Sequence, residues 1–332
     1  DMKKYDVFGI GNALVDCVCM VDDSFLIENN IEKGLMTLVD DKKQKSIIDK
    51  IKNVKPFIQS GGSVPNSIYT LSQLGGLGYL SILVSDDKFG NIYINDLINS
   101  GVYTGGEEYT IGDGMTGTCL VLTTPDAERT MNTCLAVSAK FSKKNINFDD
   151  LLLSKYLYIE GYLVTSELAM KAIHDSIAFS KENNIKVALT FSDLSMVKYF
   201  KKNFNSILKN RIDLLFCNEE EALTFSFKDN LEDSYKFLLN FSDIVIITRG
   251  DKGSIIVNNS NEIIKIKSHK VNALDTVGAG DTFAGGFLYG INNGLNLKQS
   301  GNLASALSSK VVTKLGPRLE KNDIDFIKQS LI

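Results

Sequence analysis

The chain has 332 residues, of which 44% are hydrophobic, and a formal net charge of −4, so it can form the core of one large α/β domain or two smaller ones. It contains no long run of like charge and no apolar run near the ~20 residues of a membrane helix, which argues against nucleic acid or a membrane as a partner. Five cysteines without a CxxC pair and two distant histidines argue against a zinc site or a disulfide framework, and we expect reduced thiols.

The N-terminal residues enter a strand pattern almost at once, without a signal-peptide pattern, and we expect a cytoplasmic protein. Short, nearly continuous apolar runs then alternate with helical patterns. Such runs are typical of strands covered on both faces of a parallel sheet. The predicted strands are 79–84, 156–161, 186–191, 213–217 and 244–248. The predicted helices are 66–75, 88–100, 165–183, 197–209, 218–226, 281–293, 297–315 and 321–331.

This alternation predicts an α/β fold with a central, mostly parallel sheet flanked by helices. Two segments interrupt it, residues 15–39 and 107–135, which look like strand pairs with polar turns. We expect them to form a small separate sheet that acts as a lid over a site at the carboxyl ends of the central strands. Because no repeat or linker is evident, residues 1–332 are predicted to form a single domain.

Two common phosphate-binding motifs are missing from the sequence. The segment GIGNAL (9–14) has leucine where a dinucleotide fingerprint needs its third glycine, and more strand-like sequence follows it. The chain contains no Gly-Lys dipeptide, which a P-loop requires. If the protein binds phosphate, it must therefore use another device.

The best candidate for that device is DTVGAGDTFAGGF, which runs from Asp275 to Phe287. Gly278, Ala279 and Gly280 precede a predicted helix, where small residues and unpaired N–H groups can surround an anion. Asp281 in the first turn could accept the proton of a hydroxyl that attacks phosphorus. It could equally be an ordinary acidic residue at a helix start.

Other segments also allow two interpretations. In CNEEEA (217–222), the acids suit the first turn of a helix, and they also suit Mg²⁺ held through water. ITRGDKGS (247–254) is a strand, a tight turn and a second strand, either a plain hairpin or a surface for a nucleotide. GGSVPNS (61–67) leads into a helix through glycines that permit close approach of a ligand. Asp16 is a polar residue among apolar ones, in a solvated turn or in a binding site.

Taken in this order, the segments resemble the ribokinase-like (PfkB) family of carbohydrate and nucleoside kinases, from GIGNALVD to KLGPR. DTVGAGDTFAGGF is similar to the C-terminal signature of the family, GGSVPNS to its N-terminal signature, and NEEE to its N-x-x-E metal motif. Within the family, GNALVD, TGTC (116–119) and YIEGYLVT (158–165) resemble segments of adenosine kinases. The implied fold is a central, largely parallel sheet flanked by helices, with a small β-sheet lid.

The resemblance also implies roles for individual residues. Asp281 would be the general base, the N–H groups of Gly278, Ala279 and Gly280 would hold the γ-phosphoryl group, and Arg129 would approach the transferred group. The implied acceptor site consists of Asn12, Asp16, Gly61, Gly62, Ser63, Asn66 and Tyr162. The implied ATP site consists of Asn218, Thr248, Gly250, Gly253 and Asn302. Asn218 and Glu221 would organise Mg²⁺ through water, and Asp275 is a candidate ligand for K⁺.

The leading hypothesis is therefore ATP-dependent phosphorylation of a primary hydroxyl of adenosine or a related ribonucleoside. One alternative is a sugar kinase acting on ribose, fructose or a related sugar. Another is a non-catalytic nucleoside- or sugar-binding protein on the same fold. The expected partners are ATP and a small-molecule acceptor, and the protein is expected to be a monomer or a homodimer.

Overall fold

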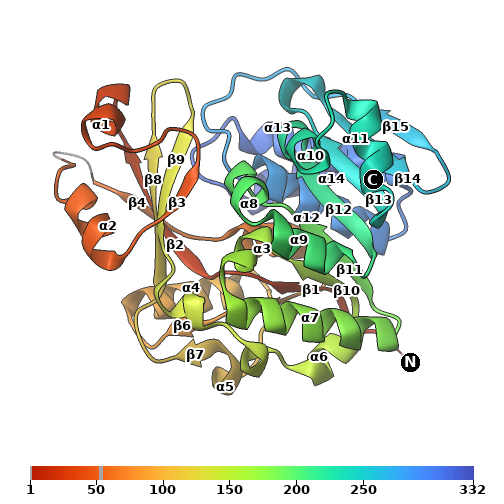
Figure 1. The fold of residues 1–332 in the computed structure, drawn as a ribbon, viewed down its shortest axis with the longest axis horizontal. Coiled ribbons are helices and arrows are strands. Elements are labelled where there is room, and N and C mark those ends of the chain that lie inside the picture. The colour runs from red at the N-terminus through yellow and green to blue at the C-terminus, as the bar shows by residue number, and fades with distance from the viewer. Residues whose placement is uncertain (1, 52–54) are drawn as a thin grey trace.

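The computed structural model describes residues 2–51 and 55–332 and contains a large and a small sheet (Figure 1). The order of the eight strands in the large sheet is β15-β14-β13-β12-β11-β10-β1-β5. From β5 to β13 all neighbours are parallel, and β14 and β15 continue antiparallel. The strands are β1 (Tyr5–Ile10), β5 (Gly78–Ser81), β10 (Ser154–Ile159), β11 (Lys186–Thr190), β12 (Ile212–Asn218), β13 (Ser242–Thr248), β14 (Ser254–Asn258) and β15 (Ile263–Ile266).

Helices cover both faces of this sheet, because its strands bury apolar side chains on both sides. Along β1, Phe8 and Ile10 belong to one core and Val7 to the other, as the pleat requires. The first core is covered by α6 (Phe148–Leu152), α7 (Glu167–Glu182), α8 (Leu194–Tyr199), α9 (Lys201–Leu208), α10 (Glu219–Ser226) and α11 (Leu231–Leu238). The second is covered by α3 (Ser63–Gln73), α4 (Lys88–Asn99), α12 (Ala279–Asn292), α13 (Leu297–Val311) and α14 (Lys321–Leu331). The predicted α/β architecture is confirmed.

The predicted elements correspond to observed ones, except that one strand and one helix are each divided in two. The expected strand 79–84 ends at Ser81 as β5, and Val84 begins a separate short strand outside the large sheet. Residues 197–209 were expected to form a single helix, but α8 ends at Tyr199 and α9 begins at Lys201. Phe200 lies between them with φ −124° and ψ 27°, outside the helical region, and packs against the first core. Tertiary packing of this aromatic ring therefore overrides the helical pattern.

The small sheet has the order β3-β9-β8-β2-β4. Its strands are β2 (Leu14–Met20), β3 (Met36–Leu38), β4 (Phe57–Gly61), β8 (Gly117–Thr123) and β9 (Arg129–Cys134). The other short elements are α1 (Asp23–Glu28), α2 (Asp41–Ile48), α5 (Glu107–Thr110), β6 (Val84–Ser85) and β7 (Ile111–Gly112), of which β6 and β7 form a separate pair. In Figure 1 this sheet lies to the left of the large one, with α1 and α2 on its outer side.

The prediction of a strand pair within residues 15–39 is wrong. Here β2 pairs with β4 and β8, whereas β3 pairs with β9 at the far edge. The helix α1 intervenes, and the edge strand β4 has no alternating pattern that would reveal it. In the segment 107–135, by contrast, β8 and β9 form the antiparallel pair that the sequence indicates.

The pleat of the small sheet turns its two faces to different surroundings. Leu14 and Val18 pack with Cys119 in a cluster on the inner face, while Cys19 packs in another cluster with residues of α1 and α2. Asp16 lies between Leu14 and Val18 in the strand and therefore shares the inner face. Strand periodicity thus places this carboxylate beneath the small sheet.

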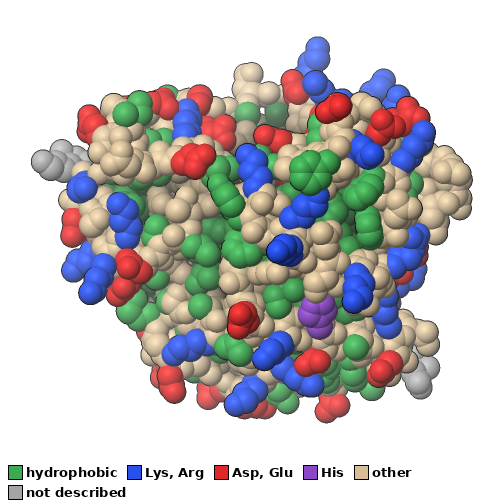
Figure 2. All heavy atoms as spheres, viewed as in Figure 1, with side chains coloured by type: hydrophobic (Ala, Val, Ile, Leu, Met, Phe, Trp, Pro, Cys, Tyr) green, Lys and Arg blue, Asp and Glu red, His purple; other side chains and the backbone are tan. Residues whose placement is uncertain are grey.

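The distribution of surface charge and the state of the cysteines can be compared with what the composition led us to expect, namely mixed charge and reduced thiols. On the face seen in Figure 2, acidic and basic side chains are interspersed. All five cysteines are free, as predicted. In the part of the chain that the structure describes, no helix combines the length and apolarity needed to cross a bilayer.

Candidate active site

A large cavity, of about 950 Å³, connects the inner face of the small sheet with the carboxyl ends of the central strands. Asn12 follows β1, Glu160 follows β10, Thr190 ends β11, Asn218 ends β12 and Thr248 ends β13. All five line the cavity. Carboxyl ends of parallel strands are the usual place for a ligand in an open α/β sheet. The volume is near the upper end of the range for ligand sites, about 300–1,000 Å³.

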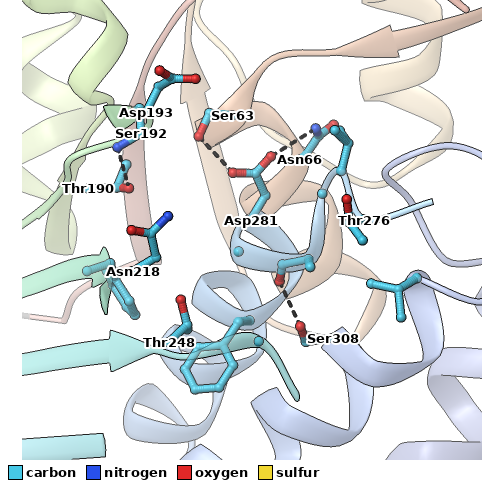
Figure 3. Close-up of a pocket in the computed structure, with 18 of the residues that line it drawn as sticks. Ser63, Asn66, Thr190, Ser192, Asp193, Asn218, Thr248, Thr276, Asp281 and Ser308 are labelled. Atoms are coloured by element: carbon cyan, nitrogen blue, oxygen red, sulfur yellow. Dashed lines mark hydrogen bonds between the residues drawn. The ribbon is translucent and has the colours of Figure 1, made fainter. Parts of the chain in front are cut away.

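Asp281 lies in the first turn of α12, at the centre of this cavity (Figure 3). Ser63 Oγ donates a hydrogen bond to Oδ1 of Asp281 at 2.7 Å, and Asn66 Nδ2 donates to Oδ2 at 3.3 Å. Ser67 Oγ donates to the main-chain oxygen of Asp281 at 2.7 Å. The two signature segments are thus joined directly, since α3 supplies all three donors to α12.

The turn before Asp281 presents main-chain N–H groups to the cavity. Gly278 has φ +79°, a left-handed conformation that glycine adopts without strain, and its missing Cβ would lie 2.5 Å from Cα of Pro317. The first N–H groups of a helix have no intrahelical acceptor, so those of Gly280 and Asp281 remain available. The N–H of Ala279 makes a long contact, 3.4 Å, with the carbonyl of Thr276. Ser308 Oγ on α13 steadies this turn by donating to the carbonyl of Ala279 at 3.0 Å (Figure 3).

The surroundings of Asp281 bring its ionisation close to neutral pH. Burial raises the pKa of its carboxyl to about 6, while hydrogen bonds from Ser63 and Asn66 and the charge of Arg318 oppose the rise. A carboxylate with this pKa is ionised at neutral pH and is a better proton acceptor than an ordinary aspartate.

A second carboxylate, Asp16, lies at the other side of the cavity and is only 7% exposed. Burial raises its pKa to about 7, opposed mainly by Arg129 and Arg318. A Cβ on Gly61 would collide with this carboxylate, so glycine at the paired position on β4 makes room for it. Gly61 is therefore next to the acid rather than on the cavity wall.

Glu160 is a buried acid that the sequence analysis assigned no role. Its Oε2 accepts the N–H of Asn12 and its Oε1 that of Val64, both at 3.0 Å, and the side chain is 0% exposed. Burial raises its pKa to about 8, and the two N–H groups oppose the rise. It ties the end of β1 to the start of α3. The sequence signal that could have revealed this buried acid is its position directly after the apolar run YLYI, where a charged residue is unusual.

The wall near Asp16 is mostly apolar, and its polar side chains include Tyr162 and Thr133. Tyr162 lines the cavity, and its hydroxyl lies 3.3 Å from Oδ2 of Asp193, another acid missed in the sequence. The remaining wall is formed by side chains of β2, β3, β8 and β9 and the residue after β9: Leu14, Met36, Leu38, Cys119, Met131 and Leu135. The opening to Asp16 is therefore hydrophobic on the side of the small sheet.

Asn218 and Glu221 form a capping box at the start of α10. Glu221 Oε1 accepts the N–H of Asn218 at 2.9 Å, and Asn218 Oδ1 accepts the N–H of Glu221 at 2.8 Å. Burial raises the pKa of Glu221 to about 7. The structural interpretation of this motif is thus correct, and both side chains also line the cavity.

The end of the cavity away from the small sheet is formed by the hairpin of β13 and β14 and by α13. Thr248, Gly250 and Gly253 of the hairpin line it. Asn302 does not: it is exposed on α13 and lies outside the cavity lining. One to two turns later the same helix contributes three hydroxyls instead, those of Ser305, Ser308 and Ser309.

Arg129 and Asp275 are brought together, away from the cavity lining. They form a buried ion pair, with side chains 1% and 0% exposed. Asp275 Oδ2 also accepts the N–H of Gly316 at 2.9 Å, and Oδ1 accepts that of Val277 at 3.2 Å. Arg129 therefore links β9 to the loop before α12, and not to the space beside Asp281. Both oxygens of Asp275 are engaged and its charge is balanced, so these residues do not fit a K⁺ site at Asp275.

Replacing K⁺ by tetramethylammonium in a turnover assay is consequently expected to leave the rate unchanged. A cation at Asp275 would have to displace the buried guanidinium of Arg129 or lie beside its positive charge, and both are unfavourable. The measurement is initial rate against K⁺ concentration at constant ionic strength. Saturable activation by K⁺ would contradict this expectation.

Comparisons with known proteins relate this chain to carbohydrate and adenosine kinases. A sequence model described as pfkB family carbohydrate kinase matches residues 38–324. Adenosine kinase 1 of Arabidopsis thaliana is 26% identical over 93% of this chain and 94% of its own length.

Two solved structures match nearly the whole chain. A probable sugar kinase from Rhizobium etli CFN 42 superimposes with a TM-score of 0.94 at 29% identity and covers 100% of both chains. Adenosine kinase from Sinorhizobium meliloti superimposes with a TM-score of 0.93 at 29% identity, over 98% of this chain and 99% of the other.

Proposed function

The chain belongs to the PfkB family of carbohydrate kinases, and from this premise we propose that it transfers the γ-phosphoryl group of ATP to a primary hydroxyl of adenosine or a related ribonucleoside. The observation that carries the proposal is that one cavity contains a buried carboxylate at a helix N-terminus, Asp281, and a second acid beneath a mostly apolar wall, Asp16.

Asp281 is proposed as the general base. An acceptor hydroxyl beside it would lose its proton to the carboxylate as the oxygen attacks phosphorus. The N–H groups of the turn from Gly278 to Gly280 would bind the phosphoryl oxygens as charge moves among them, and each such donor is worth roughly 10²–10³ in rate. The hydrogen bonds from Ser63 and Asn66 hold the base in position.

Asp16 is proposed to bind two hydroxyls of the acceptor sugar, with Asn12, Gly62 and Asn66 around it. The apolar wall that includes Met36 and Met131 supports a nucleoside, because a flat base offers apolar faces and a free sugar carries a polar group on nearly every carbon. Thr248, Gly250 and Gly253 are proposed to line the ATP site.

The charge of the cavity fits Mg²⁺ bound together with ATP. Among its described lining residues, Asp16, Glu160, Asp193, Glu221, Asp251 and Asp281 are acidic. No described cluster of three or more His, Cys, Asp or Glu side chains could hold a metal by itself. Mg²⁺ commonly binds through water and substrate phosphates with one or two carboxylates, and Glu221, with Asn218, is positioned to take part. When bound, the metal would neutralise phosphate charge beside these acids.

A second candidate is phosphorylation of a sugar, supported by the similarity to a probable sugar kinase. Initial rates of ADP formation over a panel of nucleosides, ribose, fructose and related sugars distinguish the two. We expect the highest kcat/KM with adenosine or another ribonucleoside. Turnover of a sugar without turnover of any nucleoside would reject the nucleoside assignment and leave the kinase assignment intact.

The pH profile of kcat/KM is expected to fall on the acidic side between about pH 7 and pH 6. Asp281, with a pKa near 6, loses its capacity to accept a proton as the pH falls, and Asp16, with a pKa near 7, loses its charge. The two carboxyls influence each other and titrate as a pair. Asp16→Asn should remove one ionisation from this limb and make it less steep. A flat profile down to pH 5 would contradict the role of Asp281.

A further inference from the structure

Arg318 contacts the candidate base through one intermediate residue. It lies between α13 and α14, in the segment KLGPR. Its Nε donates a hydrogen bond to Oδ1 of Asn66 at 2.9 Å, and its guanidinium lies 4.8 Å from the ring centre of Tyr69. The hydroxyl of Tyr69 in turn donates to the carbonyl of Leu319 at 2.7 Å. Asn66 and Tyr69, both on α3, therefore contact the side chain of Arg318, and Tyr69 also binds the main chain of the next residue, Leu319. These contacts hold the arginine against α3.

The contact with Arg318 determines which way the amide of Asn66 points. A guanidinium can only donate, so Asn66 must present its oxygen to it. The Nδ2 group of Asn66 then faces Oδ2 of Asp281 as a donor, at 3.3 Å, while Ser63 donates to Oδ1. Both oxygens of Asp281 consequently face donors, an arrangement that suits the ionised carboxylate.

Arg318 is also the cation that acts on Asp281. Its charge lowers the pKa of Asp281 and of Asp16, against the rise that burial causes. The other titratable groups coupled to Asp281 are acids or phenols, which do not offset its charge: Asp16, Tyr158, Glu160, Tyr162 and Glu221. Arg318 is outside the cavity lining, so it acts on the site from behind Asn66.

We propose that Arg318 is a positioning residue, which orients the amide of Asn66 and keeps Asp281 in its proton-accepting form. Without the guanidinium, the amide could rotate and turn its oxygen toward Asp281. That contact is favourable only if Asp281 carries a proton, and a protonated Asp281 is no longer a base. The inference rests on the proposed base role of Asp281.

The test is the pH profile of kcat in Arg318→Met and Arg318→Lys. For Arg318→Met we expect the acidic limb to move up by about one pH unit, from the pKa of about 6 of Asp281, so kcat falls about threefold more at pH 6.5 than at pH 8.5. Arg318→Lys keeps the charge and should shift the limb less. Lys314→Met is the matched control, because Lys314 pairs with Asp323 in the same part of the chain. It removes a positive charge without touching Asn66 and should leave the profile unchanged.

A double-mutant cycle tests whether Arg318 acts through Asn66. In an Asn66→Ala background, Arg318→Met should reduce kcat by a clearly smaller factor than in the wild type, because coupled residues are not additive. Full additivity, or a uniform fall in kcat without movement of the acidic limb, would overturn the inference. If thermal unfolding shows that Arg318→Met does not fold, Arg318→Gln replaces it with the same expected shift.

The failure of this inference can be distinguished from failure of the proposed function. If Asp281→Asn is inactive while the limb stays in place in Arg318→Met, only the role of Arg318 is rejected. If Asp281→Asn keeps wild-type turnover, the base assignment itself is rejected, and the role of Arg318 with it.

Discussion

Asp281→Asn is expected to lower kcat by about 10²–10⁴-fold, the usual contribution of a general base. The introduced amide cannot accept the proton of the acceptor hydroxyl. It can still accept the hydrogen bond from Ser63, but it would bring a second donor toward Nδ2 of Asn66, so the contact with Asn66 is weakened. Affinity for the acceptor is expected to stay within a few-fold, because Asp16 and the apolar wall are unchanged.

Steady-state kinetics with adenosine and calorimetric binding of adenosine without ATP measure the two quantities separately. Glu220→Gln is the matched control, because Glu220 is an exposed acid near the same cavity and is not part of its lining. Loss of binding in Asp281→Asn with a proportional loss of turnover would indicate a binding role. Turnover equal to the control would show that another group accepts the proton.

Gly278→Ala and Gly280→Ala are expected to impair turnover for different reasons. At Gly278 the φ of +79° costs an alanine roughly 1–2 kcal/mol, and its Cβ would meet Cα of Pro317 at 2.5 Å. The backbone must therefore move, which lowers the melting temperature and displaces the N–H groups. At Gly280 a Cβ meets no protein atom within 4 Å, and alanine favours a helix. Gly280→Ala should therefore unfold no earlier than the wild type.

The added methyl at position 280 would nevertheless occupy the cavity that the turn lines. The methyl would keep the phosphoryl oxygens away from the N–H groups of the turn, so we expect kcat to fall by up to about 10²–10³, the value of one well-placed main-chain donor. Thermal unfolding and turnover measured on both variants separate stability from catalysis. If Gly280→Ala retains full turnover with unchanged KM for ATP, the turn does not bind the phosphoryl group.

The sequence predicted the central architecture well because the necessary information is local. A strand buried on both faces needs a continuous apolar run. IVIIT (244–248) is such a run, and it forms the carboxyl-terminal part of β13. The antiparallel pair formed by β8 and β9 was also recognisable. The separation of β2 from β3 was not, because β8 and β9, which come later in the chain, lie between them in the sheet and no residue within 15–39 encodes that choice.

The candidate site shows the same division. Gly278, Asp281, Ser63 and Asn66 belong to short segments whose chemistry is visible in sequence, and the structure joins them in one cavity. Asn302 was misplaced by about a helical turn, because helix phase decides which residue of α13 faces the cavity.

The sequence could not assign the contacts of residues whose partners are far away along the chain. Arg129 was expected beside the phosphoryl group, yet it pairs with Asp275, 146 residues away. Arg318, which had no expected role, contacts Asn66 across 252 residues. Glu160 joins β1 to α3 through main-chain N–H groups that no side-chain pattern reveals.

The sequence by itself determined the layered α/β fold and the small polar segments that end at its site, because strand periodicity, helix capping and glycine conformation act between near neighbours. Only the tertiary structure decided which charge faces which carboxylate and which pKa values are raised. Burial and Coulomb interactions depend on distance in space, and these partners are far apart along the chain.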